Sequence, residues 1–316
     1  MATTRHVLSE SPFLKRCREA NSLPFLDEQP MVGSPDRSWR RFRRPLLRKC
    51  PFDVAEIEFG DILGYGVDGA VWRVSFRGRD FALKVFWDNT VPGRTRYYAI
   101  QRECHNVALL QMIQLAVEES NEPIYLKPDP KTIQDAVANL QAFCNEGGRR
   151  RQSFKDMPGA ARYTSTPRLR QCFGWTKVNE SRLFALPWGR RPPCHTVRNQ
   201  LRALQPNENY FAIVYEFVPE SAAGTALATA AADIQPQLDF FWRVGFCFAP
   251  VMRTEEWHRF GLFMDMSDLV CPWSAGWSDR MYRRFVVGDY SVVDIDGIDS
   301  DDDGGGGDGG DSLSMT

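Results

Sequence analysis

The 316-residue sequence predicts an α+β fold in which an antiparallel sheet packs against helices. Three observations lead to this class. Strand-like segments joined by tight turns fill residues 55–87, and a segment with helical periodicity follows at 95–116. Strand-like runs return at 168–175 and 209–220, before helical segments rich in alanine and aromatic residues at 221–250.

The first strands are predicted from alternation and turn residues. In "AVWRVSF", Val71, Arg73 and Ser75 alternate with a second set of residues that is wholly apolar. The following "RGRD" has the composition of a hairpin turn, and "FALKVF" continues as a third strand. Residues 55–87 are therefore expected to form three strands joined by tight turns.

The next segment predicts a long helix and then an insertion. Apolar residues with a period near 3.6 populate one broad face of 95–116, namely Ile100, Val107, Leu110, Ile113 and Leu115. Residues 118–163 are more polar and include "NEGGRRRQSFKDMPG". We expect them to form an insertion with a short helix at 131–144.

The C-terminal part is expected to hold two helices and a strand. The alanine-rich "SAAGTALATAAADI" predicts one helix, and "PQLDFFWRVGFCFAP" at 236–250 predicts a second that begins at Pro236. "RFGLFMDMSDLVCP" at 259–272 predicts a short buried strand that ends in an acidic turn.

The two ends of the chain carry opposite charge. Residues 1–50 hold eleven Lys or Arg against five Asp or Glu, whereas 291–316 hold eight Asp and no basic residue. Residues 1–52 are expected to be a basic disordered arm, and 291–316 an acidic disordered tail rich in Gly and Asp.

Compartment and membrane contact are predicted from what the sequence lacks. "MATTRHVLSESPFLKRCREA" has no apolar core of a secretory signal, and the eight cysteines show no CxxC spacing. No apolar run has the roughly 20 residues of a membrane-spanning helix. We expect reduced thiols, no membrane contact, and a nuclear or cytoplasmic rather than secreted protein.

A glycine-rich motif suggests phosphate binding. Gly64, Gly66 and Gly69 with Val71 fit G-x-G-x-x-G-x-V, and glycine lets backbone amides approach phosphate oxygens closely. Alone, this pattern is often a tight turn. A Rossmann fingerprint would need a helix next, but "AVWRVSF" is strand-like, and no Walker A lysine is present.

A lysine and a glutamate follow at informative distances. Lys84 lies in the apolar strand "FALKVF", and Glu103 lies nineteen residues later in the predicted helix, near the face of Ile100 and Val107. A strand lysine can hold nucleotide phosphates while a helix glutamate holds the lysine.

With "GYGVDGAV", "FALK", Glu103 and "AIVYEFVPE" in this order, residues 56–270 resemble the protein kinase superfamily. The resemblance implies a bilobal fold: an antiparallel-sheet N-lobe at 53–220, with the insertion at 118–163, and a truncated helical C-lobe at 221–290. It implies ATP and Mg²⁺ as ligands. The implied nucleotide-binding residues are Gly64, Gly66, Gly69, Val71, Ala82, Lys84, Glu103, Glu216 and Val218.

The sequence departs from this family where catalysis should occur. No H-R-D motif is present, and "FAPVMRTEEW" stands at the expected position, with Glu255 and Glu256 as weak substitutes for catalytic polar groups. "DMSD" resembles the D-F-G turn, so Asp265 is a candidate Mg²⁺ ligand. No A-P-E motif follows, which predicts a lost substrate platform.

The predicted function is therefore a catalytically impaired kinase-like interaction module, with or without bound ATP, that acts on protein partners. A divergent active phosphotransferase is one alternative. The layout is also similar to a fungal kinase-like family named for a kinetochore subunit of the Sim centromere complex, which implies a nuclear association. A further alternative is a chromatin or nucleic-acid protein that uses "DRSWRRFRRPLLRK" at 36–49, where arginines could contact phosphates and Trp39 and Phe42 could stack on bases. The same segment could instead be a nuclear-localisation signal, or a solvated arm that packs Trp39 onto the domain.

Overall fold

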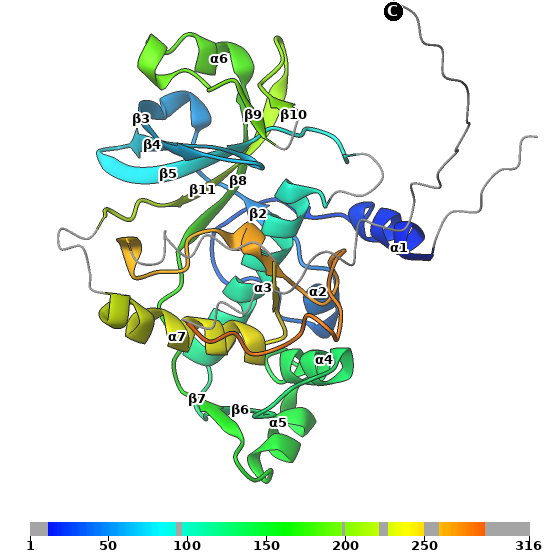
Figure 1. The fold of residues 1–316 in the computed structure, drawn as a ribbon. Helices are drawn as coiled ribbons and strands as arrows, with labels where there is room; N and C mark the ends of the chain where they lie inside the picture. The colour runs from blue at the N-terminus through cyan, green and yellow to red at the C-terminus, as the bar shows by residue number, and fades with distance from the viewer. Residues whose placement is uncertain (1–11, 93–96, 198–199, 221–226, 250–258, 288–316) are drawn as a thin grey trace, which may run out of the picture.

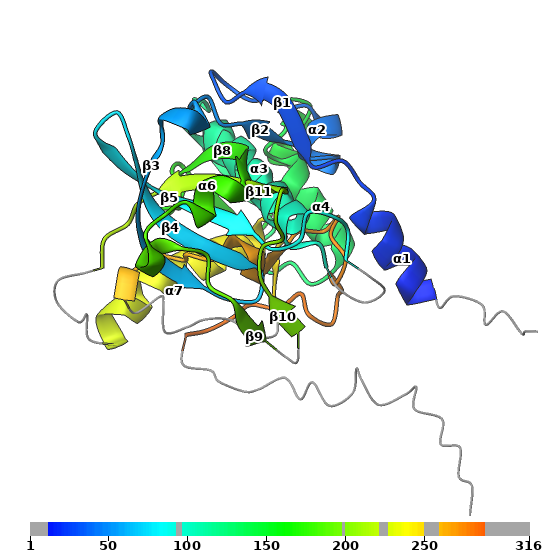
Figure 2. The same ribbon diagram turned by 90° about the horizontal axis from the view of Figure 1, so that it is seen from above.

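A computed structural model describes residues 12–92, 97–197, 200–220, 227–249 and 259–287. Its centre is a mixed seven-stranded sheet with the strand order β1-β2-β8-β11-β5-β4-β3. Helices lie mainly below the sheet in Figure 1, and Figure 2 shows the same strands from above. The α+β class is confirmed.

Five neighbouring strands of this sheet are antiparallel, as the sequence predicts. They are β3 (Glu58–Tyr65), β4 (Gly69–Phe76), β5 (Arg79–Phe86), β8 (Cys172–Asn179) and β11 (Asn209–Glu216). In the β4–β5 turn Arg77 and Gly78 have φ values of 51° and 74°. Two consecutive positive φ values match the right-handed twist of a two-residue hairpin, which explains "RGRD".

The N-terminal segment corrects the prediction of a disordered arm over 1–52. It forms α1 (Pro12–Asn21), β1 (Leu26–Pro30), α2 (Trp39–Arg43) and β2 (Leu47–Lys49), and β1 and β2 extend the sheet in parallel beside β8. Phe42 and Leu47 are fully buried. The apolar residues between the arginines therefore anchor this segment to the core. Residues 1–11 lie outside the described part, as does the predicted acidic tail at 291–316.

Strand β5 is buried on both of its faces, which places Lys84. Successive side chains point to opposite faces of a strand. Leu83 and Val85 join the core above the sheet, together with Trp72 of β4. Ala82 and Phe86 join the core below it. Lys84 lies between them in sequence and so faces α3.

Helix α3 (Ala99–Glu118) confirms the predicted helix and crosses beneath the sheet. One broad apolar face was expected, but sixteen of its residues are buried, including His105 and Asn106. The helix is enclosed by the sheet on one side and by the N-terminal and C-terminal segments on the others. The polar side chains of α3 therefore contact other parts of the same chain rather than water.

The insertion at 118–163 contributes to the lower part of the molecule rather than extending the sheet (Figure 1). It forms β6 (Ile124–Leu126), α4 (Ile133–Gln141), α5 (Gly148–Lys155) and β7 (Ala161–Tyr163), and α4 matches the predicted short helix. Leu140 and Phe143 are buried in the main core. The insertion therefore packs with the helices beneath the sheet rather than standing apart from the core.

The C-terminal region differs from the prediction in two places. A single helix, α7 (Leu227–Arg243), contains Pro236 in its interior. Ile234, Leu238 and Phe241 are all buried on one face across this proline, so apolar burial keeps the helix continuous despite the missing N–H group. After α7, the chain forms the short strand β12 (Cys247–Phe248), where the end of the helix predicted at 236–250 was expected.

The acidic turn precedes the last strand instead of ending it. A short 3₁₀ helix, η3 (Met266–Asp268), leads into β13 (Leu269–Val270), which pairs with β12. Above the sheet, η1 (Val54–Glu56), α6 (Glu180–Phe184), η2 (Trp188–Arg190), β9 (His195–Val197) and β10 (Gln200–Arg202) complete the described elements. Within the described ranges, no helix combines the length and apolar character needed to span a membrane.

Candidate functional site

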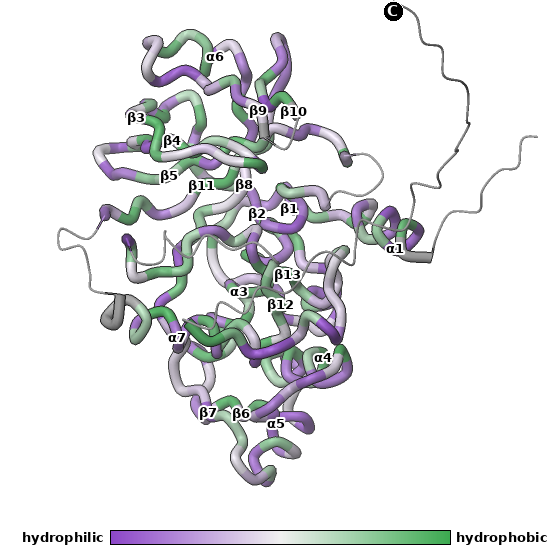
Figure 3. The backbone as a smooth tube through the Cα atoms, in the orientation of Figure 1, coloured by the Kyte–Doolittle hydropathy of each residue, from purple (hydrophilic) through white to green (hydrophobic). Residues whose placement is uncertain are grey.

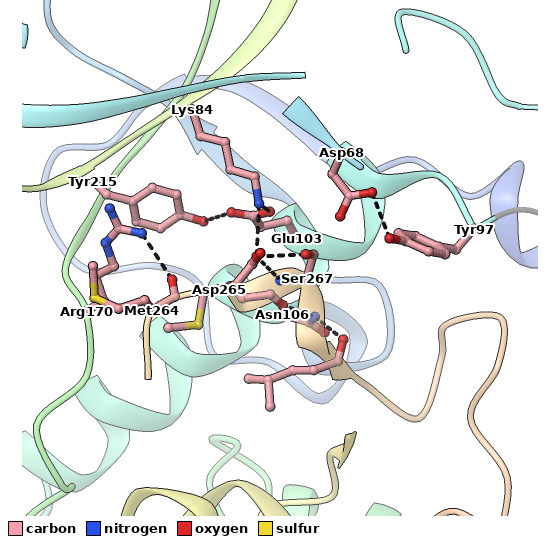
Figure 4. A network of polar contacts seen from close by, with 12 residues as sticks. Asp68, Lys84, Tyr97, Glu103, Asn106, Arg170, Tyr215, Met264, Asp265 and Ser267 are labelled. Carbon is pink, nitrogen blue, oxygen red and sulfur yellow. Dashed lines mark hydrogen bonds and ion pairs between the residues drawn. The ribbon is translucent and has the colours of Figure 1, made fainter. Parts of the chain in front are cut away.

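The structure brings Lys84 and Glu103 together. Lys84 Nζ of β5 donates to Glu103 Oε2 of α3 across 2.7 Å, and the two side chains are only 8% and 2% exposed (Figure 4). Tyr215 Oη of the neighbouring strand β11 donates to the other oxygen, Glu103 Oε1, across 2.7 Å. Both carboxylate oxygens of Glu103 are therefore satisfied, so the buried charge is compensated.

A second carboxylate approaches Lys84 from the C-terminal segment. Asp265 Oδ1 lies 2.9 Å from Lys84 Nζ, and it also accepts hydrogen bonds from the Ser267 N–H and hydroxyl groups. Asp265 is the N-cap residue of η3, with extended backbone. This local cap orients its carboxylate towards the sheet rather than towards solvent.

Helix α3 also holds the turn that carries Asp265. Asn106 Nδ2 donates to the Met266 carbonyl at 2.8 Å and to the Leu269 carbonyl at 2.7 Å, so it braces both ends of η3. Asn106 lies three residues after Glu103, and residues at this spacing share a face of a helix. One face of α3 thus positions both Glu103 and, through η3, Asp265.

The electrostatic balance of this cluster keeps Lys84 protonated. Burial by itself lowers the pKa of Lys84, but the carboxylates of Asp265 and Glu103 outweigh it and raise the pKa overall. Burial raises the pKa of Glu103, and the nearby ammonium group opposes that effect. The cluster is an ammonium held between two carboxylates, with one phenol hydrogen bond.

The glycine-rich motif forms the end of the β3–β4 hairpin above Lys84. Gly66 N donates to the Gly69 carbonyl at 2.9 Å, which closes the turn. A Cβ atom on Gly69 would lie 2.2 Å from the Val85 carbonyl oxygen, so no side chain fits there. A Cβ atom on Gly64 would meet nothing within 4 Å. Gly69 is thus required by packing, whereas Gly64 leaves open space.

An acidic side chain lies within this turn. Asp68 Oδ1 accepts a hydrogen bond from Tyr97 Oη at 2.7 Å, which joins the turn to the segment before α3 (Figure 4). The charge of Asp68 also contributes to the raised pKa of Lys84. The turn between Gly66 and Gly69 forms a roof above Lys84, and this roof combines glycine backbone with the carboxylate of Asp68.

A cavity of about 400 Å³ lies between this roof, Lys84 and Asp265. Most of the predicted nucleotide-binding residues line it: Gly64, Gly66, Gly69, Val71, Ala82, Lys84 and Val218. Arg170 and Met264 were not predicted and line it as well. Arg170 Nη1 donates to the Met264 carbonyl at 3.0 Å, and its guanidinium lies 4.4 Å from the centre of the Tyr215 ring.

Two predicted residues do not line the cavity with their side chains. Glu103 is 1% exposed and lies behind Lys84. Glu216 is turned towards Arg168, with two Nη–Oε distances of 2.8 Å, and accepts a further hydrogen bond from the Gln171 N–H. Because both of its oxygens are held in this way and its side chain does not line the cavity, Glu216 would contact a ligand there through its backbone.

The catalytic substitutes proposed from sequence, Glu255 and Glu256, lie outside the described residues. Among the residues that the structure describes, no group of three or more His, Cys, Asp or Glu side chains could hold a metal ion. Asp265 therefore could ligate Mg²⁺ only together with oxygens from a ligand or water, which is how Mg²⁺ is commonly held with phosphates.

Sequence reasoning missed Tyr215, Asn106, Asp68 and Arg170. Two of them had signals in the sequence. Tyr215 lies two residues after Ile213 and so shares its strand face, and Asn106 follows Glu103 by about one helical turn. The chain matches no known protein-family model, and it matches no curated protein.

Proposed function

We propose that the protein is a kinase-like module that holds a nucleotide with Mg²⁺ beneath the glycine turn and acts through protein partners rather than by phosphoryl transfer. One observation carries the proposal. Lys84 is fixed between Glu103 and Asp265 at 2.7 and 2.9 Å, directly under a glycine-rich hairpin and beside a cavity. A lysine held by a helix glutamate beside an aspartate is the arrangement that positions nucleotide phosphates and their metal.

The cavity has a suitable size and composition for the base and sugar. Its volume of about 400 Å³ lies within the range of small-molecule sites, roughly 300–1,000 Å³. Val71, Ala82 and Val218 supply apolar surface on its sheet side. These residues come from β4, β5 and the segment after β11, so the apolar part of the ligand would lie against the sheet.

Charge at the other end of the cavity supports a requirement for a divalent cation. Asp68 and Asp265 both line this end beside Lys84, and their charges would repel phosphate oxygens. Asp265 would hold Mg²⁺ together with ligand oxygens, and the charge of the ion would offset that repulsion. Lys84 would then contact the phosphates while Glu103 holds it. Nucleotide binding should therefore depend strongly on Mg²⁺.

Loss of phosphoryl transfer is supported by the sequence and by the carboxylates that line the cavity. The chain contains no His-Arg-Asp motif. Among described lining residues, Asp265 pairs with Lys84, Glu220 pairs with Arg259, and Asp68 accepts from Tyr97. A carboxylate already held by a partner is a poor general base, and loss of the base typically lowers rates 10²–10⁴-fold.

Thermal unfolding with and without Mg-ATP tests the proposal. Wild type should be stabilised by about 2.7 kcal/mol at a ligand concentration of 100 times Kd. Lys84→Met and Asp265→Asn should each lose this shift, as should wild type in EDTA. Lys131→Met is the matched control, because Lys131 pairs with Asp129 in the same way but its side chain is 73% exposed and lies away from the cavity.

Two results would contradict the proposal. A wild-type protein that shows no shift with millimolar Mg-ATP or Mg-ADP would not use the cavity for nucleotide. Transfer of the γ-phosphate to protein or peptide, abolished by Lys84→Met and kept in Lys131→Met, would replace the proposal with an active, divergent phosphotransferase.

A further inference from the structure

A second and larger cavity lies between α2 and α5, two helices on the lower side of the sheet in Figure 1. It measures about 840 Å³ and is formed by α2 with its following residue and by α5 with the loop that precedes it. Its lining residues are Trp39, Arg40, Arg43, Arg44, Gln141, Cys144, Glu146, Gly147, Arg149, Arg150 and Ser153. We call this space the arginine cleft.

Five arginines face each other across the cleft from two distant segments. Arg40, Arg43 and Arg44 come from α2 and its C-cap, and Arg149 and Arg150 come from α5. All five are exposed. The hydrophilic colouring of α5 is visible in Figure 3. The single carboxylate in the lining, Glu146, accepts a hydrogen bond from the Trp39 N–H at 2.8 Å.

The arginines of the cleft differ from their neighbours in having no acidic partner. Arg37 pairs with Glu119 and Arg41 pairs with Asp27. Among the described residues, no carboxylate forms an ion pair with any of the five cleft arginines. Arg150 Nη2 donates to the neutral amide oxygen of Gln141 at 3.1 Å. Several like charges held together without counter-charges favour binding of an anion.

The aromatic residues of this segment do not favour base stacking. Phe42 is fully buried. Trp39 packs against Phe42 and, edge-on, against Trp273, whose Nε1 donates to the Phe42 carbonyl at 2.7 Å. The rings that could have stacked on nucleic-acid bases therefore fix α2 to the core. The exposed groups in the cleft include the guanidinium groups, which match phosphate oxygens in geometry and charge.

We propose that the arginine cleft binds a compact ligand that carries several phosphate groups, in the manner of an inositol polyphosphate, either free or as a lipid headgroup. The arginines of α2 and its C-cap would contact the phosphates from one wall of the cleft, and those of α5 from the other wall. Binding would be independent of the cavity beneath the glycine turn, since the two sites share no lining residue.

Calorimetric titration of the full chain with inositol hexakisphosphate tests this inference. We expect saturable one-to-one binding that weakens steeply as salt rises, because phosphate contacts release counterions. Arg43→Glu and Arg149→Glu each reverse one charge on a different wall, and each should weaken Kd at least tenfold. Both side chains are exposed and have no described ion-pair partner, so the fold should persist, as circular dichroism and the thermal midpoint would verify.

Arg280→Glu is the matched control, since Arg280 is exposed and lies outside the cleft lining. Its Kd should stay within twofold of wild type. Vesicles that contain phosphatidylinositol bisphosphate separate the two ligand sources: co-sedimentation lost in Arg43→Glu would assign a headgroup, and binding of the free probe alone would assign a soluble ligand.

Three results would overturn the inference. One is no saturable binding of the probe at about 50 mM salt, where electrostatic contacts are weakly screened. Another is binding that the Arg43 and Arg149 reversals leave unchanged. The third is binding of a DNA duplex that the probe cannot displace, which would make the surface a nucleic-acid site instead.

Discussion

Asp68 Oδ1 in the glycine-rich turn accepts a 2.7 Å hydrogen bond from Tyr97 Oη, just before α3. This contact has two effects. It ties the roof of the cavity to the element that carries Glu103, and it places a negative charge where nucleotide phosphates would lie. Burial and the charge of Asp68 raise the pKa of Tyr97, so the phenol remains a donor.

Replacing Asp68 with Asn should increase the affinity for Mg-ATP several-fold, because one repulsive charge near the phosphates is removed. Isothermal titration measures the change. Asp61→Asn serves as the control, since Asp61 pairs with Arg190 and does not line the cavity. A weaker affinity in Asp68→Asn would indicate instead that Asp68 helps to hold the metal.

Tyr215→Phe should lower the free energy of unfolding by about 1.5–3 kcal/mol, because it leaves one oxygen of the buried Glu103 carboxylate without its donor. Chemical denaturation measures the loss. Tyr65→Phe provides a comparison at a position that is 53% exposed, where the change should stay within about 0.5 kcal/mol. Equal effects at the two positions would mean that the hydrogen bond from the Tyr215 hydroxyl to Glu103 does not stabilise the fold.

Gly69→Ala should destabilise the protein by about 1–3 kcal/mol, because the added methyl group would meet the backbone of Val85 and Phe86. Gly64→Ala, in the same turn, has open space around the new atom and should unfold at nearly the wild-type denaturant midpoint. If Gly64→Ala were the more damaging of the two, the turn would have a different packing from the one described.

The stability of the protein should fall as the pH drops from about 6.5 to 4, and His105 should account for part of this. Burial lowers the pKa of His105 to about 4, and its Nε2 lies 3.1 Å from the Pro24 carbonyl oxygen. An unfolded histidine has a pKa near 6.5, so the unfolded chain binds more protons in this interval and is favoured. The contribution of His105 is roughly 3 kcal/mol at most.

His105→Gln tests that contribution, since glutamine can keep a hydrogen bond to the Pro24 carbonyl but does not titrate. Urea unfolding from pH 7 to pH 4 should show a flatter loss of stability in the variant than in wild type. Parallel curves would mean that His105 is not the group responsible.

The sequence predicts local elements of this protein well and their tertiary partners poorly. Alternation and turn chemistry located β3, β4 and β5, and helical periodicity located α3. The resemblance to the protein kinase pattern implied a pair of Lys84 and Glu103, and the structure brings these side chains to 2.7 Å. Each of these depends on residues close in sequence or on a fixed motif.

The failures share one physical cause. Residues 12–49 look like a solvated arm because most of their side chains are polar, and the few apolar anchors such as Phe42 gain their effect only through burial against distant segments. Pro236 looks like a helix boundary, but the buried face that crosses it outweighs the local preference. Asp68 and Arg170 became functional candidates only when the segments that they contact were placed.

The pairing of Lys49 in β2 with Trp175 in β8 has a consequence for how the chain is made. Strands β1 and β2 can pair with each other at once, but β2 gains its other neighbour, β8, only after well over a hundred further residues. The β1–β2 edge therefore joins the rest of the sheet late, and until then Phe42 and Leu47 lack the distant segments that bury them. That interval is when the protein would depend most on chaperones.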